Sequence, residues 1–175
     1  MRSLLTCTGA LLVAATLGFT QASPPAETSV TIGGKTITIK YSAPSVRGRD
    51  IFSPSGLISH DGTYPVWRAG ANSATALHTD AALDIKGLQV PPGDYTIFCL
   101  VKDPNAWELI INKQTGQWGL EYHQDRDLGR VKMDMSKPPS LIEKYKMTLS
   151  ATGPHTGKLE MAWENHVASV PFTVK

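Results

Sequence analysis

The sequence predicts an all-β fold, either an antiparallel β-sandwich or a partly closed β-barrel of about ten short strands. Three observations lead to this prediction. Apolar and polar residues alternate over many short runs, and turns rich in glycine and proline separate these runs at short intervals. No sustained apolar stripe recurs at helical spacing.

The first 22 residues have the character of a secretory signal peptide. Arg2 is the only charged residue before Glu27, an apolar run extends over 4–19, and small residues precede the expected cleavage site after Ala22. The run is too short and interrupted for a membrane span, which takes about 20 apolar residues. We therefore expect a soluble, exported mature chain of residues 23–175, periplasmic or extracellular, that forms one domain.

The charge balance argues against a nucleic-acid partner, and the cysteine count argues against a disulfide. The chain has 17 Lys+Arg against 15 Asp+Glu, so there is no electrostatic case for a nucleic-acid partner. Cys7 would leave with the signal peptide and Cys99 would remain alone, which excludes an intrachain disulfide. The segment "DYTIFCLVK" around Cys99 is apolar on both faces, so we expect a central strand covered on both sides and an inert, buried thiol.

The strands can be placed in chain order. "TSVTIGGKTITIKYS" (28–42) predicts a hairpin, because Gly33-Gly34 supplies the positive φ angles of a two-residue turn. A long connection from Ala43 to Pro65 follows, of a length that is often functional, and "KGLQVPPGDY" (86–95) is expected to be a turn region. Further strands are expected at 66–67, 74–80, 82–85, 94–102, 106–113, 117–123, 130–135, 142–149, 158–164 and 167–174.

Several kinds of chemistry are absent from the sequence or weakly indicated. Ser59, His60 and Asp61 are consecutive, and consecutive side chains diverge in extended backbone, so we interpret them as a polar turn and not as a triad. No phosphate loop or dinucleotide fingerprint occurs, and no histidine pair has metal-ligand spacing, so we expect no cofactor and no metal. His78 and His123 each have an acid two residues later, which leaves an uncharacterised hydrolase as an alternative function.

The stretch "YPVWRAGANSATALH" (64–78) contains the strongest candidate site. Trp67, Arg68 and Asn72 lie among small residues, and Arg47 and Arg49 lie upstream around a glycine. The arginines could cradle a small anionic or polar ligand, or serve as internal struts paired with Asp50, Asp61 or Asp80, and we favour the struts. A third hypothesis is carbohydrate binding on Trp67, Trp118 or Tyr122. The sequence names no protein partner and no catalytic residue.

Four ordered segments resemble a known family: "YSAPSVRGRDIF" (41–52), "VWRAGANSAT" (66–75), "VPPGDYTIF" (90–98) and "NKQTGQWG" (112–119). With the closing "LEMAWENHVASVPFTV" (159–174), they are similar to the exported bacterial family catalogued as domain of unknown function 2911. The resemblance implies a β-rich exported domain and assigns no catalytic or binding residue. Ala69, Ser73 and Pro65 depart from the family's pattern of Thr, Glu and Gly, and Ser73 in place of an acid weakens an enzymatic interpretation. We therefore favour a non-catalytic binding or structural module.

Overall fold

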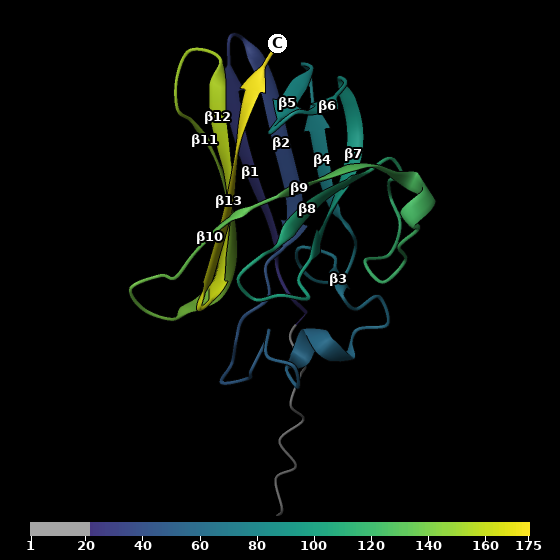
Figure 1. The fold of residues 1–175 in the computed structure, drawn as a ribbon, viewed down its shortest axis with the longest axis vertical. Coiled ribbons are helices and arrows are strands. Elements are labelled where there is room, and N and C mark those ends of the chain that lie inside the picture. Colours follow the sequence, from purple (N-terminus) through teal and green to yellow (C-terminus); the bar gives the residue numbers. More distant parts are fainter. Residues whose placement is uncertain (1–21) are drawn as a thin grey trace, which may run out of the picture.

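The computed structural model describes residues 22–175, which form two antiparallel sheets packed face to face (Figure 1). The predicted all-β fold is confirmed, and of the two predicted architectures the chain adopts the sandwich. The described part of the chain contains thirteen strands and two short 3-10 helices. The signal peptide predicted for residues 1–22 lies, except for Ala22, outside the described residues.

The first sheet has the order β1-β2-β4-β7-β8-β9, with β3 paired to β7. Its strands are β1 (Pro25–Ile32), β2 (Lys35–Ser42), β3 (Val66–Trp67), β4 (Thr75–Thr79), β7 (Gly93–Leu100), β8 (Glu108–Asn112) and β9 (Asp127–Lys132). The second sheet has the order β11-β12-β13-β5-β6, with β10 paired to β13. Its strands are β5 (Leu83–Ile85), β6 (Leu88–Val90), β10 (Asp134–Ser136), β11 (Ile142–Ala151), β12 (Thr156–Glu164) and β13 (His166–Val174).

The N-terminal hairpin forms as predicted. Ile32 pairs with Lys35 across the turn, and Gly33 and Gly34 have φ angles of +58° and +75°. Two consecutive positive φ angles are the requirement of a two-residue turn that matches the twist of the strands, and only glycine adopts them without strain. The hairpin places β2 beside β4 and extends the first sheet to its edge.

Strand β7 is covered on both faces, as predicted. Ile97 and Cys99 point into the core between the sheets, whereas Phe98 belongs to a second apolar cluster with Val66 and Ile110. Tyr122 packs edge-on against Phe98, with 5.1 Å between the ring centroids. Because burial raises the pKa of the Cys99 thiol far above its usual value, the sulfur stays protonated and unreactive.

Two segments differ from their predicted structure. Residues 117–123 form no strand, and only Trp118 makes an isolated bridge, to Ser73. In this loop Tyr122 packs against Phe98 on the outer face of the first sheet, whereas Trp118 and Leu120 are exposed, so the apolar side chains share no buried face. Strand β6 forms within a predicted turn, because Lys86 and Gly87 both take positive φ and close a tight hairpin with β5.

An aromatic cluster fills one end of the core. Trp67, Trp107 and Trp163 are buried, and the rings of Trp67 and Trp163 stack with centroids 5.8 Å apart. Phe52, from the long connection that contains helix η1 (Leu57–His60), touches all three tryptophans. The long connection thereby closes this end of the sandwich. No helix in residues 22–175 is long and apolar enough to cross a membrane.

Candidate functional site

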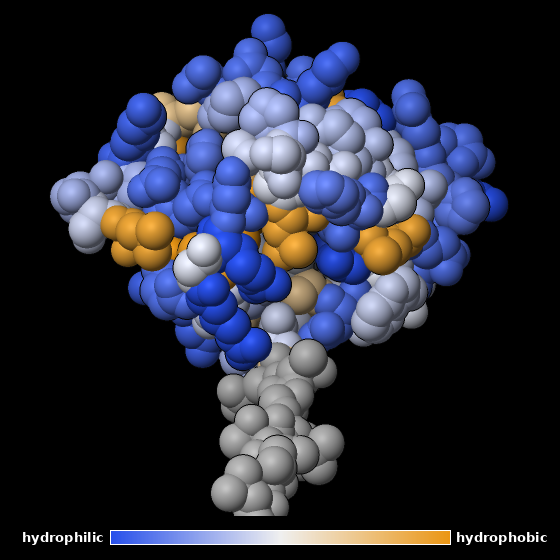
Figure 2. Space-filling view, turned by 90° about the horizontal axis from the view of Figure 1, so that it is seen from below, coloured by the Kyte–Doolittle hydropathy of each residue, from blue (hydrophilic) through white to orange (hydrophobic). Residues whose placement is uncertain are grey.

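A pocket of about 640 Å³ opens at the closed end of the sandwich, which we call the end pocket. The long connection, the segment after β7 and the turn between β12 and β13 meet there (Figure 1). Seen from this end, hydrophobic areas are separated by hydrophilic ones and form no single apolar patch (Figure 2). The side chains that carry the following argument are Arg49, Phe52, Tyr64, Lys102, Glu164 and His166, all of which line the pocket.

Glu164 occupies an unusual position in the wall of the end pocket. Trp163 pairs with His166, so Glu164 and Asn165 form a two-residue turn, and Glu164 takes φ +54°. Glycine is the usual residue at such an angle, and a non-glycine residue there is strained by about 1–3 kcal/mol. The Glu164 side chain is buried, and its Oε1 accepts a hydrogen bond of 2.9 Å from the backbone N–H of Ile51. The carboxylate thus fastens the long connection to the hairpin.

His166 lies beside this carboxylate. Its ring stacks on Trp107, with centroids 5.5 Å apart, and meets Phe52 edge to face at 5.0 Å. Nδ1 of His166 lies 3.3 Å from Oε2 of Glu164, which is within ion-pair distance. The angle between the ring nitrogen and the carboxylate oxygen does not suit a hydrogen bond. Nδ1 therefore has no hydrogen-bond partner among the described residues.

Burial sets the charge of His166. It lowers the pKa of His166 below its usual value, and the positive charge of Lys137 acts in the same direction. The Glu164 carboxylate opposes this shift without overcoming it. Because the usual pKa of histidine is about 6.5, the imidazole is neutral at pH 7. The neutral imidazole therefore lies against the Glu164 carboxylate at the pocket wall.

Arg49 and Lys102 bring positive charge to the end pocket from segments far apart in the sequence. Nε of Arg49 donates to the carbonyl of Val46 at 3.0 Å, and Nη2 donates to that of Ser45 at 2.7 Å. These bonds fix the guanidinium against its own turn. Among the described residues, Lys102 has no ion-pair partner, and its ammonium group is exposed.

Of the predicted site residues, Arg49 alone lines the end pocket. Trp67 is fully buried in the aromatic cluster, where its Nε1 donates to the carbonyl of Gly70 at 3.1 Å. Arg47 is exposed at φ +51°, and its backbone N–H donates to Oε1 of Glu143 at 2.8 Å. The structure does not bring the predicted residues together around one ligand site.

Arg68 has the contacts of a strut. Its Nη2 lies 3.3 Å from Oδ2 of Asp61, and each side chain is only 15% exposed. Burial raises the pKa of Asp61 although the charge of Arg68 acts to lower it, so desolvation outweighs the attraction within this pair. Because Asp61 pairs with Arg68, it is not the acid of a triad with Ser59 and His60.

Asn72 also holds backbone segments together. The side-chain Nδ2 of Asn72 donates to the backbone carbonyl of Ser23 at 3.2 Å and lies 3.4 Å from Oγ of Ser42. The backbone carbonyl of Asn72 accepts a hydrogen bond from the N–H of Gly119 at 3.0 Å. Asn72 takes φ +60°, an angle that asparagine tolerates better than most residues. These contacts join the segment before β1, β2 and the 113–126 loop.

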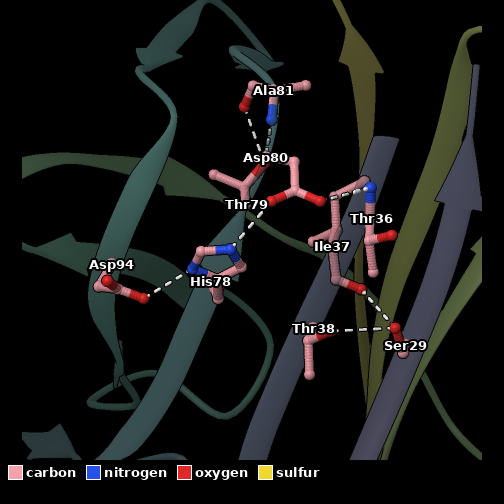
Figure 3. A network of polar contacts seen from close by, with 9 residues as sticks. All are labelled: Ser29, Thr36, Ile37, Thr38, His78, Thr79, Asp80, Ala81 and Asp94. Atoms are coloured by element: carbon pink, nitrogen blue, oxygen red, sulfur yellow. Dashed lines mark hydrogen bonds and ion pairs between the residues drawn. The ribbon is translucent and has the colours of Figure 1, made fainter. Parts of the chain in front are cut away.

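The two histidines considered for a hydrolase lie elsewhere. His78 lies on the outer face of the first sheet between two carboxylates, with Nδ1 2.7 Å from Asp94 and Nε2 3.1 Å from Asp80 (Figure 3). Both contacts raise the pKa of His78, which favours the imidazolium and leaves neither nitrogen to act as a base. His123 is exposed, and its Nε2 lies 3.7 Å from Glu121.

The carbohydrate hypothesis needs exposed aromatic rings that share a plane. Trp67 is buried, and Tyr122 is held by Phe98 and by hydrogen bonds to Asp127 and Arg130. Trp118 is 54% exposed and has no aromatic partner among the described residues. In residues 22–175, no group of three or more histidine, cysteine or acidic side chains could hold a metal ion.

Sequence reasoning missed Glu164 and His166. The signal that was available is "ENH" between two alternating runs, which indicates a two-residue turn. Nothing in those letters indicates that the carboxylate is buried, because its partner Ile51 is 113 residues away.

The fold and the end pocket define a two-sheet β-sandwich protein with a polar pocket closed by one long connection. Residues 23–172 match the model of the family described as Protein of unknown function (DUF2911), and the chain belongs to this family. The matched range includes every residue of the end pocket discussed above. No curated protein and no solved structure matches the chain.

Proposed function

We propose that this protein is an exported, non-catalytic binding module of the bacterial cell envelope, whose end pocket holds a small polar molecule with an anionic group. In this proposal residues 1–22 are removed as a signal peptide and residues 23–175 act as one domain. The observation that carries the proposal is the presence of Arg49 and Lys102 in one pocket of about 640 Å³, which is the size of small-molecule sites.

The hydrogen bonds of the acidic side chains support an anionic ligand. Asp50 accepts hydrogen bonds from both the N–H and the hydroxyl of Ser53, and Glu164 accepts the N–H of Ile51. The protein itself therefore supplies donors to these carboxylates, whereas the ammonium group of Lys102 is available to a ligand. Nη1 of Arg49 is available as well, since Nε and Nη2 hold the turn. Phe52 and Tyr64 provide apolar wall beside these charges.

A thermal-shift panel on the purified protein tests the proposal. We expect small carboxylates or phosphate esters to raise the melting temperature of the wild type, and Lys102→Met to abolish the rise while keeping most of the aliphatic stem. Lys146→Met is the matched control, because Lys146 is an exposed lysine on β11 outside the pocket. A rise that persists unchanged in Lys102→Met would place the ligand elsewhere, and no rise with any member of the panel would count against a binding module.

A further inference from the structure

We infer that the end pocket takes up its anionic ligand together with a proton, which His166 accepts, so that binding strengthens as the pH falls. This inference rests on the proposed function and specifies the regulation of the same pocket. It begins from the placement of Glu164 and His166 side by side in the pocket wall, with their nearest oxygen and nitrogen 3.3 Å apart.

The charge of this pair opposes an incoming anion at neutral pH. With His166 neutral, Glu164 gives the pair a net negative charge in a half-buried place where charges are weakly screened. The carboxylate cannot easily turn away, because Ile51 holds its Oε1. Protonation of His166 makes the pair of side chains neutral in total and gives the imidazole ring a second N–H donor. An anion in the pocket therefore favours the protonated form, and by linkage the protonated form favours the anion.

The ring is placed to accept the proton without moving far. Trp107 and Phe52 hold the plane of His166, and Nδ1 is buried without a hydrogen bond. Once both ring nitrogens carry a proton, the Nδ1–H can donate a charge-assisted hydrogen bond to Oε2 of Glu164 after a small rotation. His166 also lines an adjoining hollow of about 150 Å³ on the side of Lys137, so the ring faces two hollows and not one.

Charged groups of both signs surround His166. Glu164 favours the protonated ring, whereas Lys137, beyond β10, disfavours it. The other charged groups that line the end pocket are Arg49 and Asp50 from the long connection and Lys102 after β7. A bound anion adds a negative charge to this set and shifts the balance towards protonation.

The backbone at Glu164 supports a role for its carboxylate beyond the turn. A glycine would relieve the strain of the positive φ angle. It would also remove the carboxylate, which accepts the N–H of Ile51 with one oxygen and lies against His166 with the other. Strained residues of this kind cluster at functional sites, which is the ground for assigning the carboxylate a role in the pocket.

Acetate is a suitable probe, with chloride at equal ionic strength as the control for screening. We would titrate acetate into the purified protein at pH 8 and at pH 5.5 and follow the backbone amides of Ser53 and Asn165 by NMR. One linked proton tightens binding by up to about tenfold per pH unit within the titration range of the histidine. Calorimetry in buffers of different ionisation enthalpy should show net proton uptake when acetate binds, and no such uptake in His166→Gln.

Variants separate the possible outcomes. His166→Gln should bind acetate with an affinity that no longer depends on pH, and Glu164→Gln should bind at pH 8 more tightly than the wild type does. His155→Gln, at an exposed histidine, should behave as the wild type. Acetate affinity that is equal at both pH values, or pH dependence that survives in His166→Gln, would overturn the inference and leave the proposed function standing. No acetate-induced shift at either pH would also overturn the inference, whereas the proposed function is tested separately by the full thermal-shift panel.

Discussion

Oε2 of Glu164 lies 3.3 Å from Nδ1 of His166, while Oε1 of the same carboxylate accepts a hydrogen bond from the buried backbone of Ile51. One side chain therefore joins the β12–β13 hairpin to the long connection and sets the electrostatic environment of the pocket histidine. Glu164→Gln, which keeps an oxygen acceptor for the N–H of Ile51 but removes the negative charge, separates the structural effect from the electrostatic one.

The structural part of this relationship predicts an unusual order of stability among substitutions at position 164. Glu164→Ala leaves the N–H of Ile51 without an acceptor away from water, which should lower the free energy of unfolding by about 1–3 kcal/mol. Glu164→Gly loses the same bond but relieves the positive φ angle, and should recover about 1 kcal/mol of that loss. Urea denaturation of the three proteins measures both differences. Equal stability of the alanine and glycine variants would mean that φ at this residue is not strained.

Two histidines should shift the stability in opposite directions with pH. The pKa of His166 is lowered in the folded protein, so its contribution is fully present above the unfolded pKa of about 6.5 and is lost as the pH falls through the folded pKa. The pKa of His78 is raised, so its contribution is present below the unfolded pKa and is lost as the pH rises through the folded pKa. The His78 contribution should be small and should weaken with added salt, because the site is exposed.

Chemical denaturation between pH 5 and pH 8 tests these signs. In His166→Gln the loss of stability towards acid should be smaller than in the wild type, and in His78→Gln the loss towards alkali should be smaller. If His166→Gln loses as much stability towards acid as the wild type, His166 is not the buried neutral base described above.

Local sequence was sufficient to predict much of this fold. The Gly33-Gly34 hairpin and the covered strand around Cys99 follow from turn chemistry and alternation over a few residues, and both predictions were confirmed. The 117–123 segment was wrongly predicted because its alternation of apolar residues is not an alternation of burial: Trp118 and Leu120 are exposed, and Tyr122 packs against Phe98 without strand pairing. Glu164 could not be predicted, since a glutamate has no local preference for positive φ and its partner lies in another part of the chain.

The contact between the 113–126 loop and the Trp67–Asn72 stretch gives a prediction about glycine. A Cβ at Gly119 would lie 2.3 Å from Cδ of Arg68 and 2.5 Å from the carbonyl oxygen of Asn72. Because the second contact is with backbone, Gly119→Ala must displace the loop, and we expect a loss of about 1–3 kcal/mol. Gly62→Ala is the control, since a Cβ there meets nothing within 4 Å. Thermal denaturation of the two variants measures the difference, and equal melting temperatures would contradict the close packing of this loop.

The last prediction concerns Arg68 and decides between its two hypothetical roles. If Arg68 is a strut, Arg68→Ala leaves Asp61 largely buried and unpaired, which should lower the free energy of unfolding by about 3 kcal/mol. This value lies at the low end for buried pairs, because both side chains keep 15% exposure and Asp61, whose pKa is raised by burial, can take up a proton. A loss of this size lowers the melting temperature of a domain this large by about 10 °C. Asn72→Ala removes the side-chain amide that contacts Ser23 and Ser42, and should lower the free energy of unfolding by about 1–3 kcal/mol.

Arg126→Ala provides the matched control for this measurement. Arg126 is exposed, and its Nε lies 3.8 Å from an exposed Asp125, so its loss should change stability by less than about 0.5 kcal/mol. If Arg68→Ala melts at the temperature of Arg126→Ala, the strut hypothesis is wrong. Arg68 would then have to be tested as a ligand-binding residue, with the same anion panel that is used for Lys102.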